Sequence, residues 1–268
     1  MIRIRPLIAI LIPLAFAGCE LNFKPGTDSL LEGLNTTISP GELATMAIDP
    51  YDANNRYVGT LGLANEAFAN EPVYIKLFED NLNDPEPSVR FAAARGLGTH
   101  GDPSHVPLLV KSLSDVDRLV RMESARSLQR LHNPVAIDPL INAMHEPDAT
   151  RPKDPSEPEA IVRAEAAIAL GQYQEQKVVQ ALVAGLDDSE LAVNQAALQS
   201  LQGLTGQDFQ IDRAAWAEWL GRTKSPFAAH GTYTYPVFNR EYKWYEYFPF
   251  VPKPHNEIAT PPAGLPRG

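Results

Sequence analysis

Apolar side chains in the middle of the chain return every 31 residues, with one interval of 42 that equals 31 plus an insertion of 11. Three columns keep this register: Phe78, Leu109, Leu140 and Leu182; Leu82, Leu113, Met144 and Leu186; Leu97, Leu128, Leu170 and Leu201. Two further columns hold a Val-Arg pair and a small residue: Val89-Arg90, Val120-Arg121, Val162-Arg163 and Val193-Asn194; Ala93, Ser124, Ala166 and Ala197. A long internal period of this kind indicates a repeat architecture.

Each repeat is predicted to contain two helices. In the first helix the apolar residues follow helical spacing, as in Val106, Leu109 and Val110. The second helix is expected to start after an acidic residue that can cap it and complement its dipole. These acidic residues stand six positions before the arginine column: Asp84, Asp115, Glu157 and Asp188 precede Arg90, Arg121, Arg163 and Asn194. Because one hairpin cannot bury its apolar face alone, we expect an all-α fold, an α-solenoid of about four to five repeats over residues 41–221.

The acidic residue, the Val-Arg six positions later and the following Ala-x-x-Leu resemble the HEAT family, in the short form called PBS-lyase HEAT-like repeats. The resemblance implies a ladder of ion pairs between neighbouring repeats. The residues placed to form its rungs are Asp84 with Arg90, Asp115 with Arg121, and Glu157 with Arg163. Asn194 replaces the arginine at the last rung, and a weaker earlier unit contains Arg56, Thr60 and Leu63. The resemblance specifies the fold and leaves the function open.

Two segments modify the repeat array. Residues 146–159 form the insertion, and four prolines among mostly acidic residues predict a surface loop rather than a helix. A functional face and a tolerated surface loop both remain open for it. After the last repeat, a helix near 213–221 carries Trp216 and Trp219 and is expected to cap the last apolar face. This closing segment is similar to one seen in planctomycete-type HEAT proteins.

The C-terminal tail, residues 222–268, holds ten of the 22 aromatic residues together with eight prolines. A disordered tail would be poor in aromatic residues, so the segment is expected to lie on another surface. Packing as an extended strap along the solenoid is the favoured interpretation, because so many rings would otherwise form an exposed patch. Binding to a partner protein or to the envelope surface is the alternative.

The N-terminus has the features of an export signal. Arg3 and Arg5 precede an apolar stretch of about ten residues, which is too short for a bilayer core that needs about 20. Residues 1–18 are therefore predicted to be a signal peptide. Small residues before Cys19, the only cysteine in the chain, resemble the bacterial lipobox. The resemblance implies lipidation of Cys19, a lipid-anchored tether over residues 19–40, and a periplasm-facing position in the cell envelope, at the inner or the outer membrane.

Composition and motifs argue against several kinds of chemistry. A net charge of −10 disfavours nucleic acid as a partner, because phosphates require a basic face. We found no zinc spacing, phosphate loop or nucleophile motif, and we predict no metal or cofactor. HEAT-like deoxyhypusine hydroxylases build a di-iron site from several His-Glu pairs, and here His145-Glu146 stands alone.

These observations favour a non-catalytic protein-binding scaffold or adaptor, tethered to the envelope by its lipid. The family resemblance implies that the second helices line the concave side, where an arginine cluster suits an acidic peptide or protein. The candidate partner-binding residues are Arg95, Glu123, Arg126 and Arg130, with Trp244 and Tyr245 of the tail. The alternative is a lyase-like or metal-dependent oxygenase-like HEAT-repeat enzyme, or an enzyme subunit.

Overall fold

The computed structural model describes residues 38–148, 150, 156–237, 240–249, 251 and 257–266. The predicted signal peptide, Cys19 and nearly all of the predicted tether lie outside these residues. Every described helix belongs to one compact unit, Pro40–Gly268. The α-helices are α1 (Pro40–Ala47), α2 (Ala53–Ala64), α3 (Pro72–Asn81), α4 (Pro87–His100), α5 (Val106–Ser112), α6 (Arg118–Leu128), α7 (Ile137–Met144), α8 (Ala160–Leu170), α9 (Gln176–Gly185), α10 (Leu191–Thr205) and α11 (Arg213–Arg222).

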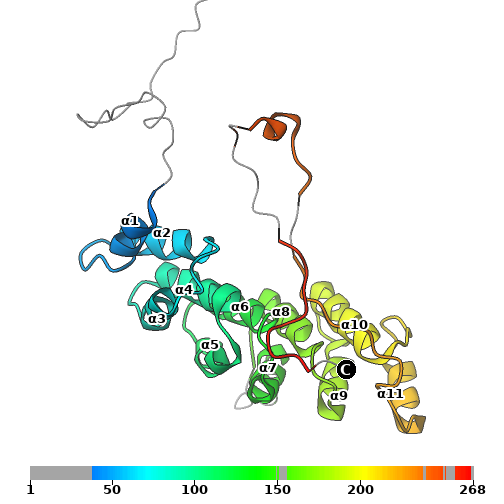
Figure 1. Ribbon diagram of the computed structural model, residues 1–268. Coiled ribbons are helices and arrows are strands. Elements are labelled where there is room, and N and C mark those ends of the chain that lie inside the picture. Colours follow the sequence, from blue (N-terminus) through cyan, green and yellow to red (C-terminus); the bar gives the residue numbers. More distant parts are fainter. Residues whose placement is uncertain are drawn as a thin grey trace, which may run out of the picture. The chain divides into compact units, whose positions relative to one another are not determined.

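The first ten helices form helix hairpins, each made of two successive helices, and the hairpins follow one another along the unit (Figure 1). The second helices of the pairs, α2, α4, α6, α8 and α10, pack on each other in that order. We call the surface that they form the second-helix face. The predicted α-solenoid is confirmed, with five helix pairs among the described residues. The weak early unit is the first of these pairs, and its Thr60 and Leu63 are fully buried.

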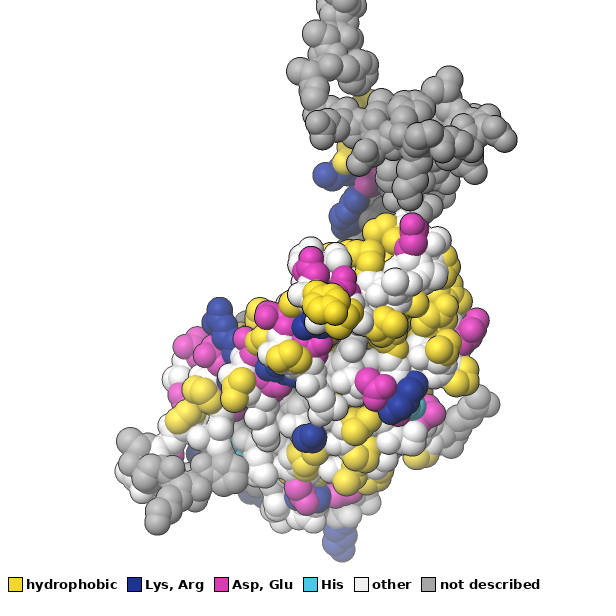
Figure 2. Space-filling model, turned by 90° about the vertical axis from the view of Figure 1, so that its left-hand side faces the viewer, with side chains coloured by type: hydrophobic (Ala, Val, Ile, Leu, Met, Phe, Trp, Pro, Cys, Tyr) yellow, Lys and Arg dark blue, Asp and Glu magenta, His cyan; other side chains and the backbone are white. Residues whose placement is uncertain are grey.

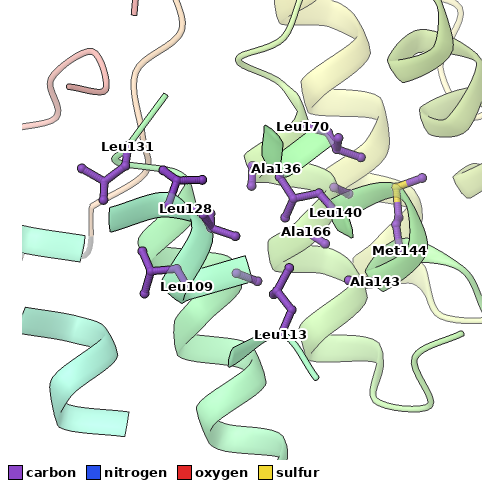
Figure 3. Packing of buried hydrophobic residues seen from close by; sticks show 14 of the residues in the cluster. Leu109, Leu113, Leu128, Leu131, Ala136, Leu140, Ala143, Met144, Ala166 and Leu170 are labelled. Carbon is purple, nitrogen blue, oxygen red and sulfur yellow. The ribbon is translucent and has the colours of Figure 1, made fainter. Parts of the chain in front are cut away.

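Leucines of the periodic columns form the core between the two layers of helices. Figure 3 shows how Leu109 of α5, Leu128 of α6 and Leu140 of α7 lie in the space that these neighbouring repeats share. All three are fully buried. Since burying a leucine side chain contributes roughly 1.5–3 kcal/mol, the recurrence of these columns stabilises every interface along the stack.

Small residues allow neighbouring second helices to approach closely. A Cβ added to Gly98 of α4 would stand 2.5 Å from the Cβ of Ser127 in α6, which is too close for two carbon atoms. Ser127 Oγ donates a hydrogen bond of 2.9 Å to the carbonyl of Ala94. Two repeats further on, Ser200 Oγ of α10 donates to the carbonyl of Ala167 in α8 at 2.8 Å. The same contact between second helices therefore recurs along the stack.

Helix α11 packs against α9 at the end of the repeats. Trp216 is fully buried, and its indole N–H donates to the carbonyl of Gln210 at 2.9 Å. Phe209 meets the Trp216 ring edge-on, with the ring centres 5.0 Å apart. The aromatic groups thus cover apolar surface that a further repeat would otherwise bury.

The insertion begins and ends at one place on the stack. The backbone N–H of Glu157 donates to the carbonyl of His145 at 2.8 Å, so the chain leaves and re-enters the repeat at neighbouring positions. The described insertion residues 146–148, 150 and 156–159 are non-helical, as the prolines predict. The remaining ones, 149 and 151–155, lie outside the described residues.

Candidate functional site

A ladder of arginine–carboxylate pairs connects each repeat to the next. The pairing corrects the expected rungs: Arg90, Arg121 and Arg163 bind the carboxylate of the following repeat and not the one six positions earlier. Each arginine donates two hydrogen bonds to an acidic residue of the following repeat: Arg56 to Asp84 at 2.6 and 3.0 Å, Arg90 to Asp115 at 2.7 and 2.8 Å, Arg121 to Glu157 at 2.6 and 2.8 Å, and Arg163 to Asp188 at 2.8 and 2.8 Å. The third guanidinium nitrogen bonds a backbone carbonyl of its own repeat, as Arg121 Nη1 does to Asp115 at 2.9 Å. Such two-pronged pairs fix orientation as well as charge.

The acidic residues of the ladder do not cap the second helices, which corrects the expectation from their position. The N-cap residues stand two positions later, at Glu86, Asp117, Glu159 and Glu190. Each ladder carboxylate instead accepts the backbone N–H of that N-cap residue, as Asp115 does from Asp117 at 2.9 Å. One carboxylate thus shapes the turn before its own helix and binds the arginine of the preceding repeat.

Asn194 ends the ladder with a neutral side chain that still binds its own repeat. Its amide nitrogen donates to the carbonyls of Gly185, Leu186 and Asp188 at 3.1, 2.8 and 3.0 Å. These carbonyls belong to the end of α9 and the turn after it, and the arginines bond the carbonyl equivalent to that of Asp188 through Nη1. Asn194 therefore keeps the contact within the repeat and omits the contact to a following repeat.

The predicted binding arginines lie on the second-helix face, paired with carboxylates. Arg95 of α4 stands 3.2 Å from Glu123 of α6, and Arg126 donates to Glu165 of α8. Burial raises the pKa of Glu123, although Arg95 and Arg126 favour its charged form. On the side of the molecule where α1 and α3 lie, Figure 2 also shows basic side chains beside acidic ones. The structure brings these predicted residues together as a balanced network, not as a free cationic patch.

Two segments of the tail cross the second-helix face, and we call residues 229–237 and 257–266 the strap (orange and red in Figure 1). They contact each other where Tyr235 N–H donates to the carbonyl of Thr260 at 3.3 Å. The first segment meets α10 through Gly231 N–H and the carbonyl of Gly203, 2.8 Å apart. The second meets the end of α6, where Ala263 N–H donates to the carbonyl of Arg130 at 2.8 Å.

The part of the tail between these segments departs from the favoured expectation that its rings pack on the solenoid. We call residues 240–249 the aromatic loop. Trp244 is 77% exposed and Tyr247 is 71% exposed, and Tyr245 is also exposed. Conversely, residues 257–266, which lie beyond the aromatic cluster, are docked. Backbone hydrogen bonds and the Arg130 side chain hold the strap in place, and Phe227 and Tyr235 pack on the repeats beside it. The rings of the tail are therefore divided between a docked group and the exposed aromatic loop.

An ion pair organises the aromatic loop. The carboxylate of Glu246, itself buried, accepts hydrogen bonds from the guanidinium of Arg240 and from the backbone N–H of Lys243, the latter at 2.7 Å. Arg240 first, and then the Lys243 N–H, lower the pKa of Glu246 to about 2. The carboxylate closes a 3₁₀ turn over Trp244–Tyr247. The exposed rings are therefore presented on a defined turn.

A cavity of about 450 Å³ lies between α4, the end of α6 and the strap. Its walls include Arg95, Arg126 and Arg130 from the repeats, and Val237 and Glu257 from the strap. Three guanidinium groups thus converge on one cavity that the tail partly closes.

His145-Glu146 offers no metal centre in the described parts of the chain. Glu146 accepts the backbone N–H of Ser189 at 3.3 Å, and also its hydroxyl. Across those parts, no group of three or more His, Cys, Asp and Glu side chains is placed to hold a metal ion.

Sequence reasoning missed Tyr235, Glu257 and Ala263. All three contact Arg130 or its neighbours, which lie more than a hundred residues away in the chain. Unlike the ladder residues, they belong to no periodic column, so no spacing signal could have paired them.

A family model described as HEAT repeats matches residues 75–157 and 154–215. None of the curated proteins matches the chain. Among solved structures, the chain is similar to the complex of CpcE and CpcF of phycocyanin lyase from Nostoc, with 22% identity, a TM-score of 0.42, and coverage of 75% of this chain and 85% of that one.

A designed armadillo repeat protein is 14% identical with a TM-score of 0.47, over 71% of this chain and 94% of the other. Human deoxyhypusine hydroxylase is 20% identical with a TM-score of 0.30, over 68% and 84%. At these identities the likeness concerns the fold alone.

Proposed function

This chain belongs to the family of HEAT-repeat proteins, and on that premise we propose that it is a non-catalytic scaffold that binds a protein partner at the cell envelope. The repeat stack supplies a rigid platform, since the arginine–carboxylate ladder and the shared leucine core connect each unit to the next. Binding by such a platform needs a surface that is exposed, apolar and held in one conformation.

The aromatic loop is the observation that carries this proposal. Trp244 and Tyr247 present most of their ring surface to solvent while Glu246 holds the turn beneath them. Tryptophan and tyrosine dominate the energetics of protein interfaces, because they bury a large area with few rotatable bonds. A braced loop also loses little conformational entropy on binding.

A capture experiment tests the loop. The full chain carrying Trp244→Ala and Tyr247→Ala serves as bait on cross-linked, detergent-solubilised envelope. We expect a partner that the wild-type chain retains to be lost at least tenfold. Tyr51→Ala is the matched control, because Tyr51 is 96% exposed but lies at the other end of the stack, before α2. Equal recovery with both variants would contradict the proposed surface.

We propose further that the lipid on Cys19 supplies the membrane attachment. Positive residues, a short apolar stretch and Ala17-Gly18 before Cys19 support this proposal. Among the described residues, no helix is long and apolar enough to cross a bilayer. Replacing Cys19 by Ser should release the protein from sedimented envelope into the soluble fraction. Retention of that variant in membranes after a salt wash would refute the anchor.

A non-catalytic role is also a proposal, and metal analysis tests it against the oxygenase-like alternative. Protein purified without chelators is expected to contain iron well below one atom per chain. Stoichiometric iron that disappears on His145→Ala would favour the enzymatic alternative, because His145-Glu146 is its only sequence support.

A further inference from the structure

The strap docks on the solenoid as an added strand would. Leu131 and Ala263 form a parallel β-bridge, in which Ala263 N–H donates to the carbonyl of Arg130 and His132 N–H donates to the carbonyl of Ala263, both at 2.8 Å. Main-chain pairing of this kind accepts many sequences, since it uses groups that all residues except proline possess. The turn after α6 therefore offers a general edge for an extended segment.

The Arg130 side chain contacts two side chains of the strap. Its guanidinium donates to the carboxylate of Glu257 at 2.6 Å, and its Cζ lies 4.7 Å from the centre of the Tyr235 ring. The Glu257 side chain is 43% exposed, so this pair is close to solvent and open to exchange. The strap thus presents one carboxylate to a cluster of arginines.

The surface beneath the strap is polar rather than apolar. The side chains of His132 and Gln172 interact with each other there, and the strap contributes the buried hydroxyl of Tyr233. His132 is also the residue whose backbone binds Ala263. A contact with little buried apolar surface opens at lower cost than the leucine core does.

The cavity beside the strap adds room and charge. Arg95 and Arg126 face it together with Arg130, and Glu257 supplies the strap's carboxylate to it. Arg95 and Arg126 already stand beside Glu123 and Glu165, so Arg130 is the arginine whose carboxylate partner can be exchanged, and the other two add positive charge to the cavity wall. A segment that places a carboxylate where Glu257 stands therefore suits this site.

We propose that residues 257–266 occupy the docking site of an extended acidic segment of a partner protein. The segment replaces them by pairing its backbone with residues 130–132 and placing a carboxylate on Arg130. The strap is then a tethered competitor, because its attachment to the same chain gives it an effective concentration on the order of millimolar. This surface goes beyond the proposed function of the aromatic loop, and its test does not involve the loop.

Gly264→Val in the full chain weakens the competitor without touching the groove's arginines. Gly264 has a φ of +83°, which β-branched residues avoid, and an added Cβ would stand 2.4 Å from Pro103 Cγ. The probe is a fluorescein-labelled peptide of residues 257–266, with a second peptide in which three further positions are glutamate. Both should bind Gly264→Val at least tenfold more tightly than the wild type, and the acidic peptide more tightly of the two. Gly231→Ala is the matched strap control, because its Cβ would meet nothing nearer than 3.7 Å.

Adding Arg130→Ala to Gly264→Val should abolish binding of the acidic peptide, with circular dichroism and the melting curve verifying that the stack is folded. Absence of peptide binding to folded Gly264→Val, or equal binding with and without Arg130, would overturn the proposal. Dimerisation of Gly264→Val that excludes the peptide would overturn it too, by making a second copy the occupant. None of these outcomes changes the prediction for Trp244→Ala and Tyr247→Ala, so the two proposals fail separately.

Discussion

Arg121 of α6 and Glu157 of the next repeat, which contains the insertion, bind each other through two hydrogen bonds of 2.6 and 2.8 Å. Asp115 and Asp188 occupy the same place in repeats without an insertion. The ladder therefore continues through the interruption, because the closed loop returns Glu157 to the register that its neighbours keep. The ladder sets the spacing of the units and the insertion does not alter it.

Arg121→Ala is expected to lower the free energy of unfolding by about 1–3 kcal/mol, because it leaves the Glu157 carboxylate and two backbone carbonyls without their donor. Thermal and urea unfolding measure the loss. Arg118→Ala is the control on the same helix, since Arg118 is 63% exposed and stands 3.6 Å from Glu159. Surface pairs of that kind contribute about 0–1 kcal/mol. An equal loss of unfolding free energy in both variants would contradict a contribution of the ladder to stability.

Shortening the insertion should change stability little. Glu157 N–H and the carbonyl of His145 already join its two ends, and the entropy of closing a loop changes by only about 0.6 kcal/mol per doubling of length. Replacing residues 148–155 by two glycines keeps Glu146 and its bonds to Ser189. The melting temperature is expected to stay within a few degrees of the wild type. A large fall would mean that the excised residues contact the stack.

Trp216→Ala should be among the most destabilising substitutions at the end of the stack. The ring is fully buried, touches Phe209 and Trp219, and uses its N–H, so its removal leaves a large cavity. Such truncations cost about 3–5 kcal/mol. Trp244→Ala should leave the melting temperature unchanged, because that ring is mostly exposed. A similar loss for both would contradict the capping role of α11.

Periodicity explains how much of this fold the sequence predicts. The leucine columns recur four times, and an acidic residue six positions before an arginine recurs three times, with Asn194 in place of the arginine at the fourth. Each copy therefore supports the assignment of the others. This redundancy predicts the helix pairs, the stacking and the residues of the ladder. It does not give their pairing, because each arginine binds the carboxylate of the next repeat and not the one six positions earlier. It does not place the helix starts, because the carboxylate two positions before the N-cap and a capping carboxylate leave similar local patterns.

The tail has no such redundancy. Its aromatic residues predict ring burial by composition, but only some of them are docked, such as Phe227 and Tyr235, and backbone pairing at Ala263 and one carboxylate on Arg130 hold the segment that follows the rings. Backbone pairing leaves no signature in side chains, and a single ion pair has no period. The surface arginines illustrate the same limit, since their acidic partners become visible only when α4, α6 and α8 are packed together.

Acid should loosen the aromatic loop as the pH falls toward 2. Glu246 has its pKa lowered from 4.5 to about 2 by Arg240 and the Lys243 N–H, so the folded loop favours the charged carboxylate. This contribution is fully present above pH 4.5 and is lost as the pH falls toward 2. The fluorescence of Trp244 is obtained by subtracting the spectrum of Trp244→Phe from that of the wild type. Its emission should shift over that pH range. Glu246→Gln should show at neutral pH the Trp244 emission that the wild type reaches only in acid. If the emission of both proteins does not depend on pH, Glu246 does not hold the turn.

Brief digestion with chymotrypsin should cut the chain first in the aromatic loop, because its rings are exposed and not packed on the solenoid as the sequence led us to expect. Trp244, Tyr245 and Tyr247 are exposed chymotrypsin sites, whereas Tyr233 and Tyr235 lie in the docked strap.

The nicked protein should keep its C-terminal piece through gel filtration, because Ala263 pairs with the backbone at residues 130–132 and Glu257 binds Arg130. Mass spectrometry of the eluted peak identifies the piece. In Gly264→Val the same piece should be lost, since the added side chain collides with Pro103. Cleavage at Tyr233 or Tyr235 as early as at Trp244 would mean that the strap is not docked in solution, and retention of the piece in both proteins would mean that the bridge at Ala263 is not what holds it.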